Sequence, residues 1–534
     1  MSKAIVCTDL FFEWPDGTVV FDGLDVAFDQ GRTGLIGLNG SGKSTLFKLI
    51  TGQLSPVSGH IAVEGALGYL DQELTLDTDQ TVAELLGIAR KRDALRAIEG
   101  GDASEANFSL VGDDWDIEEQ ALAKLERFGI ALEGAEPLDR TVGCLSGGEA
   151  VLIALAGLAL SKPGVTLLDE PTNNLDRDAR TRLYEAVESW PGVLVVVSHD
   201  RELLERMDQI AELRQGGVSI WGGNYTDYIT QLEAEQEAAQ RMVRVAEADV
   251  RKEKQQLKEA RIKLDRRVRY GNKMYANKRE PKVVMKQRKR DAQVAAGKHR
   301  IMQAGKLDEA KRSLTDAECE VRDDDRIRIS LPDTRVAAGQ DVLELEGSDG
   351  RLYVRGPERI AMTGANGAGK TTLLRAITGD SDHRELTVEH VTDRVGYLPQ
   401  RLDILDDRLS VLDNVRAAAP TATPHDVRAN LARFLIRGDR VDQPASVLSG
   451  GERFRVSLAR LLLADPPPRL LVLDEPTNNL DLDSVRQLTE ALSAYKGALL
   501  VASHDYAFLR EIGITRWWRI EPGRMPFEAD EPTD

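Results

Sequence analysis

GLNGSGKST occupies residues 37–45, and the same pattern returns as GANGAGKTT at residues 364–372. The first copy follows residues 33–36, which predict a buried strand, and precedes residues 46–51, which predict a helix. Glycines in such a loop let backbone N–H groups surround phosphate groups, and the dipole of the following helix favours negative charge. Each copy therefore predicts a phosphate-binding loop in an α/β domain, and the duplication predicts two such domains.

Each loop supplies a lysine and a hydroxyl for nucleotide chemistry. We expect Lys43 and Lys370 to reach the terminal phosphates, and the hydroxyls of Ser44 and Thr371 to bind Mg²⁺. The predicted nucleotide contacts of the first loop are Gly37, Asn39, Gly40, Ser41, Gly42, Lys43, Ser44 and Thr45. The matching contacts of the second loop are Gly364, Asn366, Gly367, Ala368, Gly369, Lys370, Thr371 and Thr372.

Two apolar runs end in a pair of acids, VTLLDE at residues 165–170 and LLVLDE at residues 470–475. Buried parallel strands have this pattern, and ligands bind at the carboxyl ends of strands in open α/β sheets. We expect Asp169 and Asp474 to hold Mg²⁺. Glu170 and Glu475 are the predicted catalytic carboxylates, because a carboxylate beside the metal and the triphosphate can orient the attacking water.

A histidine follows each acid at the same distance. His199 and His504 end apolar runs 30 residues after Asp169 and Asp474. Each histidine predicts a γ-phosphate contact, with an ordinary loop histidine as the alternative. Gln72 and Gln400, which follow GYLD and GYLP, are predicted to contact Mg²⁺ and the water.

The spacing of the repeated motifs indicates an insertion in the first half. The interval from Gln72 to Ser146 is 74 residues, whereas that from Gln400 to Ser449 is 49, so the first half holds 25 extra residues. They include a polar stretch at 100–114 and a helical pattern at 115–128. We predict a first α/β domain at 1–230 with the insertion within about 85–140, a helical linker at 231–325 and a second α/β domain at 326–534.

Residues 234–313 are rich in Ala, Gln, Glu, Lys and Arg, which is typical of long surface helices. Gly271, Asn272 and Pro281 predict the turn of a projecting helical hairpin near residues 270–281. Two helices of about 35–40 residues would each span roughly 50–60 Å. A flexible charged linker is the alternative, which the low Gly and Ser content disfavours.

The net charge of −18 is unevenly distributed. Residues 251–300 hold 19 Lys and Arg against 5 Asp and Glu, so this window carries +14 and the rest of the chain −32. Such a window predicts a polyanionic partner, because Lys and Arg bind phosphates and aromatic rings stack on unpaired bases. A solvated helix face is the alternative. The predicted RNA contacts are Arg266, Arg267, Arg269, Tyr270, Lys273, Tyr275, Lys278, Arg279, Lys282, Lys286, Arg288, Lys289 and Arg290.

The bulk composition favours a folded cytoplasmic protein. Apolar residues make up 42% and charged residues 30% of the 534 positions. The longest conspicuous apolar run, residues 151–160, is about half of a membrane-spanning helix, and MSKAIVCTDL lacks the apolar segment of a signal peptide. Cys7, Cys144 and Cys319 are too scattered for a disulfide framework or a metal pair.

The complete motif set resembles that of the ATP-binding-cassette ATPases. LSGGE, at residues 145–149 and 448–452, matches the family signature and lies between a phosphate loop and a strand that ends in DE. The resemblance implies that two cassettes close head to tail over two ATP molecules and that hydrolysis lets them part. It implies that Ser449, Gly450, Gly451 and Glu452 complete the site of Lys43, and that Ser146, Gly147, Gly148 and Glu149 complete the site of Lys370.

Within that superfamily, the chain resembles the ABC-F subfamily of ribosome-associated ATPases. Both cassettes lie on one chain, PTNNLD is similar to the subfamily's PTNHLD loop, and GGNYTDY at 222–228 is similar to the end of its first cassette. Asn174 and Asn479 depart from that loop. The resemblance implies a monomer that enters the ribosomal E site with ATP and Mg²⁺ bound. Its linker would reach toward rRNA and the P-site tRNA.

Adenine recognition differs between the halves. Trp14, before Pro15-Asp16-Gly17, is a predicted adenine contact, with a core aromatic residue as the alternative. The second half has a shortened segment at 342–358 and no clear counterpart.

Three functions fit these patterns. The first is an ABC-F protein that acts on translation, either as a general factor or by protecting the ribosome from antibiotics. The second is the ATPase subunit of a drug exporter, which the basic linker disfavours. The third is a DNA-structure-binding ATPase of the same subfamily, which is disfavoured because those chains carry a long C-terminal coiled coil.

Overall fold

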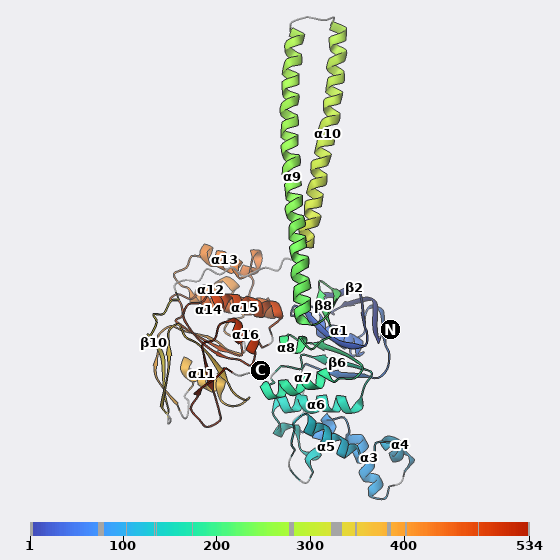
Figure 1. Cartoon of the computed structure of the whole chain (residues 1–534), viewed down its shortest axis with the longest axis vertical. Helices are drawn as coiled ribbons and strands as arrows, with labels where there is room; N and C mark the ends of the chain where they lie inside the picture. Colours follow the sequence, from blue (N-terminus) through green and yellow to red (C-terminus); the bar gives the residue numbers. More distant parts are fainter. Residues whose placement is uncertain are drawn as a thin grey trace. The chain divides into compact units, whose positions relative to one another are not determined.

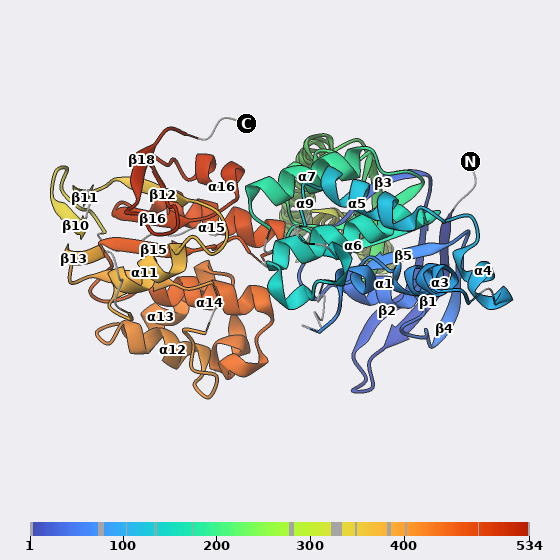
Figure 2. The same cartoon turned by 90° about the horizontal axis from the view of Figure 1, so that it is seen from below.

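The computed structural model describes residues 4–72, 79–102, 104–132, 134, 136–173, 175–276, 282–321, 334–347, 350–381, 386–400, 403–478 and 480–531. The chain forms two compact units. One is Thr226–Asp325, and the other combines Met1–Tyr225 with Arg326–Asp534. The larger unit contains two α/β halves of the same design (Figures 1 and 2).

A six-stranded sheet forms the centre of each half. In both sheets the strands are parallel except for the last pair, and the order is the same: β5-β6-β7-β3-β8-β9 and β14-β15-β16-β12-β17-β18. Strands β6, β7, β15 and β16 are completely buried and mostly apolar, as expected for parallel strands covered on both faces. The first sheet comprises β3 (Gly31–Gly37), β5 (Leu67–Leu70), β6 (Val165–Asp169), β7 (Val193–Val197), β8 (Gln209–Arg214) and β9 (Gly217–Gly222). The second comprises β12 (Arg359–Thr363), β14 (Val395–Leu398), β15 (Leu470–Asp474), β16 (Ala498–Ala502), β17 (Arg516–Arg519) and β18 (Phe527–Ala529). This architecture confirms the predicted pair of tandem α/β domains.

A three-stranded antiparallel sheet accompanies each central sheet. The first contains β1 (Ile5–Glu13), β2 (Val19–Phe28) and β4 (Ser58–Val63), and the second contains β10 (Asp341–Gly347), β11 (Gly350–Arg355) and β13 (Leu386–Val391). Five residues, including Trp14, connect β1 to β2, whereas two connect β10 to β11. The shorter second hairpin matches the shortening predicted from the sequence.

Helices begin within or directly after the sequence motifs that occur in both halves. In the first half these are α1 (Lys43–Ile50), α6 (Gly147–Ser161), α7 (Arg177–Glu188) and α8 (Arg201–Leu204). Their counterparts are α11 (Lys370–Thr378), α14 (Gly450–Leu462), α15 (Leu482–Ala494) and α16 (Tyr506–Glu511). Aspartate side chains start several of them: Asp176 accepts from the N–H of Ala179, and Asp481 from that of Ser484. Each motif is therefore held at a helix terminus.

The extra residues of the first half form additional helices. This region contains α2 (Val82–Leu85), α3 (Ala89–Glu99), α4 (Glu105–Val111), α5 (Ile117–Arg127), η1 (Pro137–Asp139) and η2 (Val142–Cys144). In its place, the described part of the second half has α12 (Val411–Ala418), α13 (Pro424–Arg433), η3 (Gly438–Asp442) and η4 (Ala445–Val447). Helix α5 fits the pattern predicted at 115–128, and α4 lies within the polar stretch. The buried guanidinium of Arg92 bonds Glu118, Glu136 and Asp139, which ties α3 to α5 and η1.

The smaller unit is a helical hairpin made of α9 (Tyr225–Ala276, 52 residues) and α10 (Lys282–Glu320, 39 residues) (Figure 1). The predicted hairpin is confirmed, since α9 ends at Ala276 and α10 begins at Lys282, both within the turn region predicted at 270–281, and α10 has the expected length. The expected length of about 35–40 residues is wrong for α9, as is the expected helix break at Gly271. The reason is that α9 begins before residue 231 and continues through Gly271, since one glycine costs a helix only about 1 kcal/mol. Pro281 lies outside the described residues. Among the described helices, none is long and apolar enough to cross a membrane.

Candidate nucleotide sites

The two phosphate loops hold their lysines in the same way. Lys43 Nζ donates to the carbonyl oxygens of Gly37 at 2.8 Å and Leu38 at 3.1 Å, and Lys370 Nζ donates to that of Gly364 at 2.7 Å. Gly42 precedes α1 with φ 104°, a left-handed conformation that suits glycine. A Cβ atom there would lie 2.6 Å from Val20 Cγ1. Both ammonium groups are thus held by carbonyl oxygens of their own phosphate loops.

An aspartate ends the strand beside each loop. Asp169 ends β6 and Asp474 ends β15, and each is only 1% exposed. None of their carboxylate oxygens makes a hydrogen bond of ordinary geometry among the described residues. Burial raises the pKa of both carboxyls, and the nearby hydroxyls of Ser44 and Thr371 oppose that rise. Buried carboxylate oxygens beside a hydroxyl fit the oxygen ligands that Mg²⁺ prefers.

The next residue in each half is a buried glutamate with a strained backbone. Glu170 has φ 49° and Glu475 has φ 44°, values uncommon for a residue with a side chain. Burial raises the pKa of Glu170 to about 8, with the charge of Lys43 opposing, and that of Glu475 to about 7, with Lys370 opposing. These carboxyls accept a proton more readily than ordinary ones, as a general base requires.

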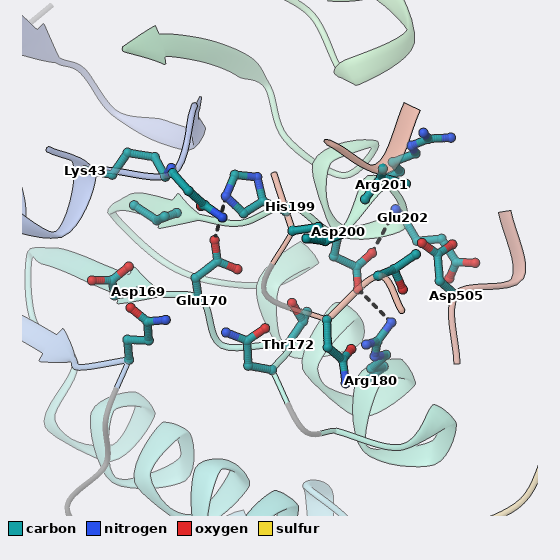
Figure 3. Close-up of a pocket in the computed structure, with 18 of the residues that line it drawn as sticks. Lys43, Asp169, Glu170, Thr172, Arg180, His199, Asp200, Arg201, Glu202 and Asp505 are labelled. Carbon is teal, nitrogen blue, oxygen red and sulfur yellow. Dashed lines mark hydrogen bonds and ion pairs between the residues drawn. The ribbon is translucent and has the colours of Figure 1, made fainter. Parts of the chain in front are cut away.

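A histidine contacts each glutamate. His199 Nε2 lies 3.2 Å from Glu170 Oε1 (Figure 3), and His504 Nε2 lies 3.4 Å from Glu475 Oε1. Burial, followed by the charge of the loop lysine, lowers the pKa of each imidazole to about 3. The histidines are therefore neutral, and His504 Nε2 accepts a hydrogen bond of 2.8 Å from Lys370 Nζ.

Most of the predicted site residues line one of two cavities. The first, of about 880 Å³, is lined by Trp14, Asn39, Gly40, Gly42, Lys43, Ser44, Thr45, Gln72, Asp169, Glu170 and His199. The second, of about 340 Å³, is lined by Asn366, Gly367, Gly369, Lys370, Thr371, Thr372, Gln400, Asp474, Glu475 and His504. Among the predicted loop contacts, Gly37, Ser41, Gly364 and Ala368 line neither cavity. Trp14 is 38% exposed at the first cavity and packs edge-on against Phe12.

The signature residues cap helices. Ser146 accepts from the N–H of Glu149 at the start of α6, and Ser449 from that of Glu452 at the start of α14; each glutamate returns a capping-box bond. Neither cavity is lined by a signature residue. Gly450 lines a separate cavity with Gln400 and Glu475 of its own half. The completion of each site by the opposite signature stays a prediction.

Contacts between the halves add residues that sequence reasoning missed. Asp481 Oδ2 accepts a hydrogen bond of 2.9 Å from the backbone N–H of Asn39. Thr477 and Asn478 also line the first cavity, and Arg180 and Asn478 line both. The PTNNLD motif could have directed attention to this region. The spacing of motifs, however, does not show that Asn39 contacts a residue 442 positions later in the chain.

The basic residues predicted to contact RNA are exposed wherever the structure describes their side chains. They are Arg266, Arg267, Arg269, Lys273, Lys286 and Arg290, with Tyr270 67% exposed among them. The side chains of Tyr275, Lys282, Arg288 and Lys289 lie outside the described part of the structure, as do residues Lys278 and Arg279. Asn174 and Asn479 also lie outside it.

Comparison with known proteins matches this geometry to one family. The family model described as ABC transporter matches residues 21–173 and 348–478. The chain is 30% identical over 95% of its length to the probable ATP-binding protein YbiT of Escherichia coli O157:H7, covering 94% of that protein. It is 31% identical over 92% of its length to the tylosin resistance ATP-binding protein TlrC of Streptomyces fradiae, covering 92% of it. It is 29% identical over 92% of its length to ABC transporter F family member 5 of Arabidopsis thaliana, covering 71% of it.

Solved structures share the fold. Archaeal ribosome recycling factor aABCE1, in complex with ribosomal stalk protein aP1, matches 97% of this chain and 89% of its own at 20% identity, with a TM-score of 0.55. A model of ribosome-bound archaeal Pelota and ABCE1 matches 98% of this chain and 78% of its own at 20% identity, with the same TM-score. The duplicated motifs, the paired sheets and the near full-length relatives agree, and this chain therefore belongs to the ABC-F family of ATP-binding-cassette proteins.

Proposed function

We propose that this protein hydrolyses ATP with Mg²⁺ at its two nucleotide sites and uses the cycle to bind and leave the ribosome, where it acts on translation in the cytoplasm. The observation that carries the proposal is the duplicated set of lysine, aspartate, glutamate and histidine around two cavities, joined on one chain to a basic helical hairpin.

The chemistry follows from the side chains. Lys43 and Lys370 would leave the loop carbonyls for the β- and γ-phosphates, while Asp169 and Asp474 would hold Mg²⁺ with Ser44 and Thr371. Mg²⁺ neutralises charge on the phosphates when bound. Glu170 and Glu475 would take a proton from the attacking water, an effect of about 10²–10⁴-fold on rate. The neutral histidines would orient the glutamates and the γ-phosphate.

The hairpin supports a polyanionic partner. Its described arginines and lysines at 266–290 are exposed, and the window 251–300 carries +14 on an otherwise acidic chain. One relative is named as a tylosin resistance protein, and two structural neighbours are named with ribosomal components. These names favour the ribosome as the polyanion, and protection against an antibiotic is the role we propose to test first.

Sedimentation with ribosomes tests the proposal. The double variant Glu170→Gln, Glu475→Gln should retain ATP and sediment with ribosomes in ATP but not in ADP. Adding Arg266→Gln, Arg267→Gln and Arg269→Gln should release it. A matched triple, Lys306→Gln, Lys311→Gln and Arg312→Gln, removes as many exposed charges from α10 and should leave it bound. A double variant that stays at the top of the gradient in ATP contradicts ribosome binding.

The antibiotic role has its own test. Expression of the wild-type chain in a susceptible host should raise the minimum inhibitory concentration of macrolides or related drugs, and the double glutamine variant should not. An unchanged panel of macrolides, lincosamides, pleuromutilins and phenicols would leave the general translation role and reject protection from those drugs.

A further inference from the structure

Arg180 is held in place by a fixed carboxylate. It lies on α7, four residues after Asp176, and its Nη1 is 3.4 Å from Asp200 Oδ2 (Figure 3). Asp200 is itself fixed, because Oδ2 accepts from the hydroxyl of Tyr184 at 2.7 Å and Oδ1 accepts from the N–H of Glu202 at 2.9 Å. The guanidinium is therefore paired with a carboxylate that is itself held by several hydrogen bonds.

The second half surrounds this guanidinium with acids. Arg180 lines the second cavity together with Lys370, Glu475 and His504. Burial acts to lower its pKa, but Asp200, and then Asp505 and Glu475, outweigh burial and raise it. Its side chain is 16% exposed, and its Nε is buried without a hydrogen-bond partner among the described residues. A first-half cation with free donor capacity thus faces the catalytic groups of the second half.

The two halves differ at this position. The residue 305 positions after Arg180 is Val485, just as Asp481 follows Asp176. Val485 is 3% exposed and lines only the first of the two cavities, whereas Arg180 borders both. Tyr184, which supports Asp200, corresponds to Thr489. At this position of the two equivalent helices, the sequence therefore places a cation only on α7, whose residues line the second site, and an apolar residue on α15.

We propose that Arg180 acts in trans at the second site, where its guanidinium contacts the γ-phosphate of the nucleotide held by Lys370. The inference rests on the proposed ATP hydrolysis. In that reaction a water oxygen bonds to the γ-phosphorus, the bond from phosphorus to the β,γ-bridging oxygen breaks, and Glu475 takes the water proton. The products are ADP and phosphate. Charge gathers on the phosphoryl and leaving oxygens, and a guanidinium with several donors stabilises it.

The consequence is an unequal pair of sites. The second site hydrolyses ATP faster than the first, because Val485 offers no donor to the nucleotide held by Lys43. The first site then serves mainly to keep the halves together while the second turns over.

Variants that leave one competent site test this inference. Glu170→Gln isolates the second site and Glu475→Gln isolates the first. Arg180→Met in the Glu170→Gln background should lower kcat by about 10²-fold, the effect of removing one transition-state donor, with KM for ATP changed far less. Arg180→Lys should restore part of the rate. In the Glu475→Gln background, Arg180→Met should lower kcat at least tenfold less than it does in the Glu170→Gln background, although Arg180 also borders the first cavity.

A structural role would give a different pattern. Asp200 adjoins His199, so loss of a merely structural Arg180 would damage the first site as much as the second, and equal losses overturn the proposal. Arg182→Met, on the same helix but lining neither cavity, is the matched control and should change neither rate. If the Glu170→Gln parent hydrolyses no ATP, the proposed function falls as well. If it hydrolyses ATP and Arg180→Met leaves kcat unchanged, only this inference falls.

The reciprocal change gives an independent readout. Val485→Arg in the Glu475→Gln background should raise kcat of the first site, with thermal melting used to select variants that remain folded. A folded Val485→Arg variant with unchanged or lower kcat would count against a cation as the feature that separates the two sites.

Discussion

The backbone N–H of Asn39 donates a hydrogen bond of 2.9 Å to Oδ2 of Asp481, joining the phosphate loop of the first cassette to the PTNNLD motif of the second. Oδ1 of the same carboxylate accepts from the N–H of Ser484 at 2.8 Å and so starts α15. Burial acts to raise the pKa of Asp481, but the bonds from Asn39 and Ser484 outweigh it and lower that pKa. One ionised side chain thus couples helix formation in one cassette to loop position in the other.

Removal of Asp481 should affect both cassettes. Asp481→Ala loses the α15 cap, worth about 1 kcal/mol, and the bond to Asn39. We expect lower thermal stability and slower hydrolysis at the first site, measured by melting and by ATPase rate in the Glu475→Gln background. Asp481→Asn keeps a capping oxygen and should recover the stability. Asp178→Ala, at an exposed position of α7, is the control; a first-site rate that is the same in Asp481→Ala and in this control would contradict the coupling.

The pH dependence of ATP hydrolysis should follow the buried glutamates. Burial raises the pKa of Glu475 to about 7, so in the Glu170→Gln background kcat/KM should fall as pH drops through about 7. The reason is that a protonated carboxyl cannot accept the water proton, and kcat/KM reports the free enzyme. A pH–rate profile from 5 to 9 measures the midpoint. A midpoint near 4.5 would show that Glu475 has an ordinary pKa and is not the base.

The same glutamates should make stability depend on pH. Unfolded Glu titrates near about 4.3, whereas the folded pKa is about 7 for Glu475 and about 8 for Glu170. These two groups therefore hold more protons in the folded protein in this window, and their contribution to stability is full below the unfolded pKa and is lost as pH rises through 7 to 8. Relative to wild type, the double glutamine variant should gain on the order of 5 kcal/mol between pH 5 and 8, since each pKa unit corresponds to about 1.4 kcal/mol. Urea titrations at both pH values check this. Glu99→Gln, at an exposed position, should show no such gain.

Trp14 should distinguish the two sites by base stacking. Trp14→Ala removes a ring at the first cavity and should weaken ATP binding there by roughly 1–3 kcal/mol, the range for stacking of a base on an aromatic ring. The KM for ATP in each single-glutamine background, where only one site turns over, measures the effect. Trp14→Phe should bind nearly as well as wild type, and Trp115→Ala, an exposed tryptophan of the insertion, should not change affinity. Equal weakening at both sites would contradict adenine stacking on Trp14.

Binding to RNA should be strongly salt-dependent. A hairpin that neutralises about 6–10 phosphates loses roughly 10³–10⁵ in affinity between 50 and 200 mM salt. Filter binding across that range measures the slope, and Arg266→Gln with Arg269→Gln should reduce it by about two contacts. A flat response would exclude the hairpin as the phosphate contact.

The elements that could be predicted from the sequence are those specified by a short stretch of residues. The buried strands before Glu170 and Glu475, and the helices after Lys43 and Lys370, follow from short apolar runs and glycine loops, and the structure has them in place. The insertion could be predicted because the spacing between the same two motifs can be compared in the two halves.

Features that depend on a balance over a long segment, or on contacts between residues far apart in the chain, could not be predicted from the sequence. Helix α9 runs through Gly271 because the surrounding helix formers outweigh one glycine, a balance that a turn signal alone does not reveal. The bond from Asn39 to Asp481, and the position of Arg180 beside Glu475, depend on how two cassettes meet. Comparison of the halves at Arg180 and Val485 was the one available signal, since a charge replacing a buried apolar residue marks a difference between the sites.

The head-to-tail pairing of the cassettes is tested most directly by the two signature serines in the single-site backgrounds. Ser449→Ala should lower kcat in the Glu475→Gln background, where only the site of Lys43 is competent, and spare the Glu170→Gln background. Ser146→Ala should do the reverse, and because each change removes an equivalent helix cap, the two variants control for one another. If each serine instead affects the site of its own cassette, the two sites are not completed by opposite halves, and the account is wrong.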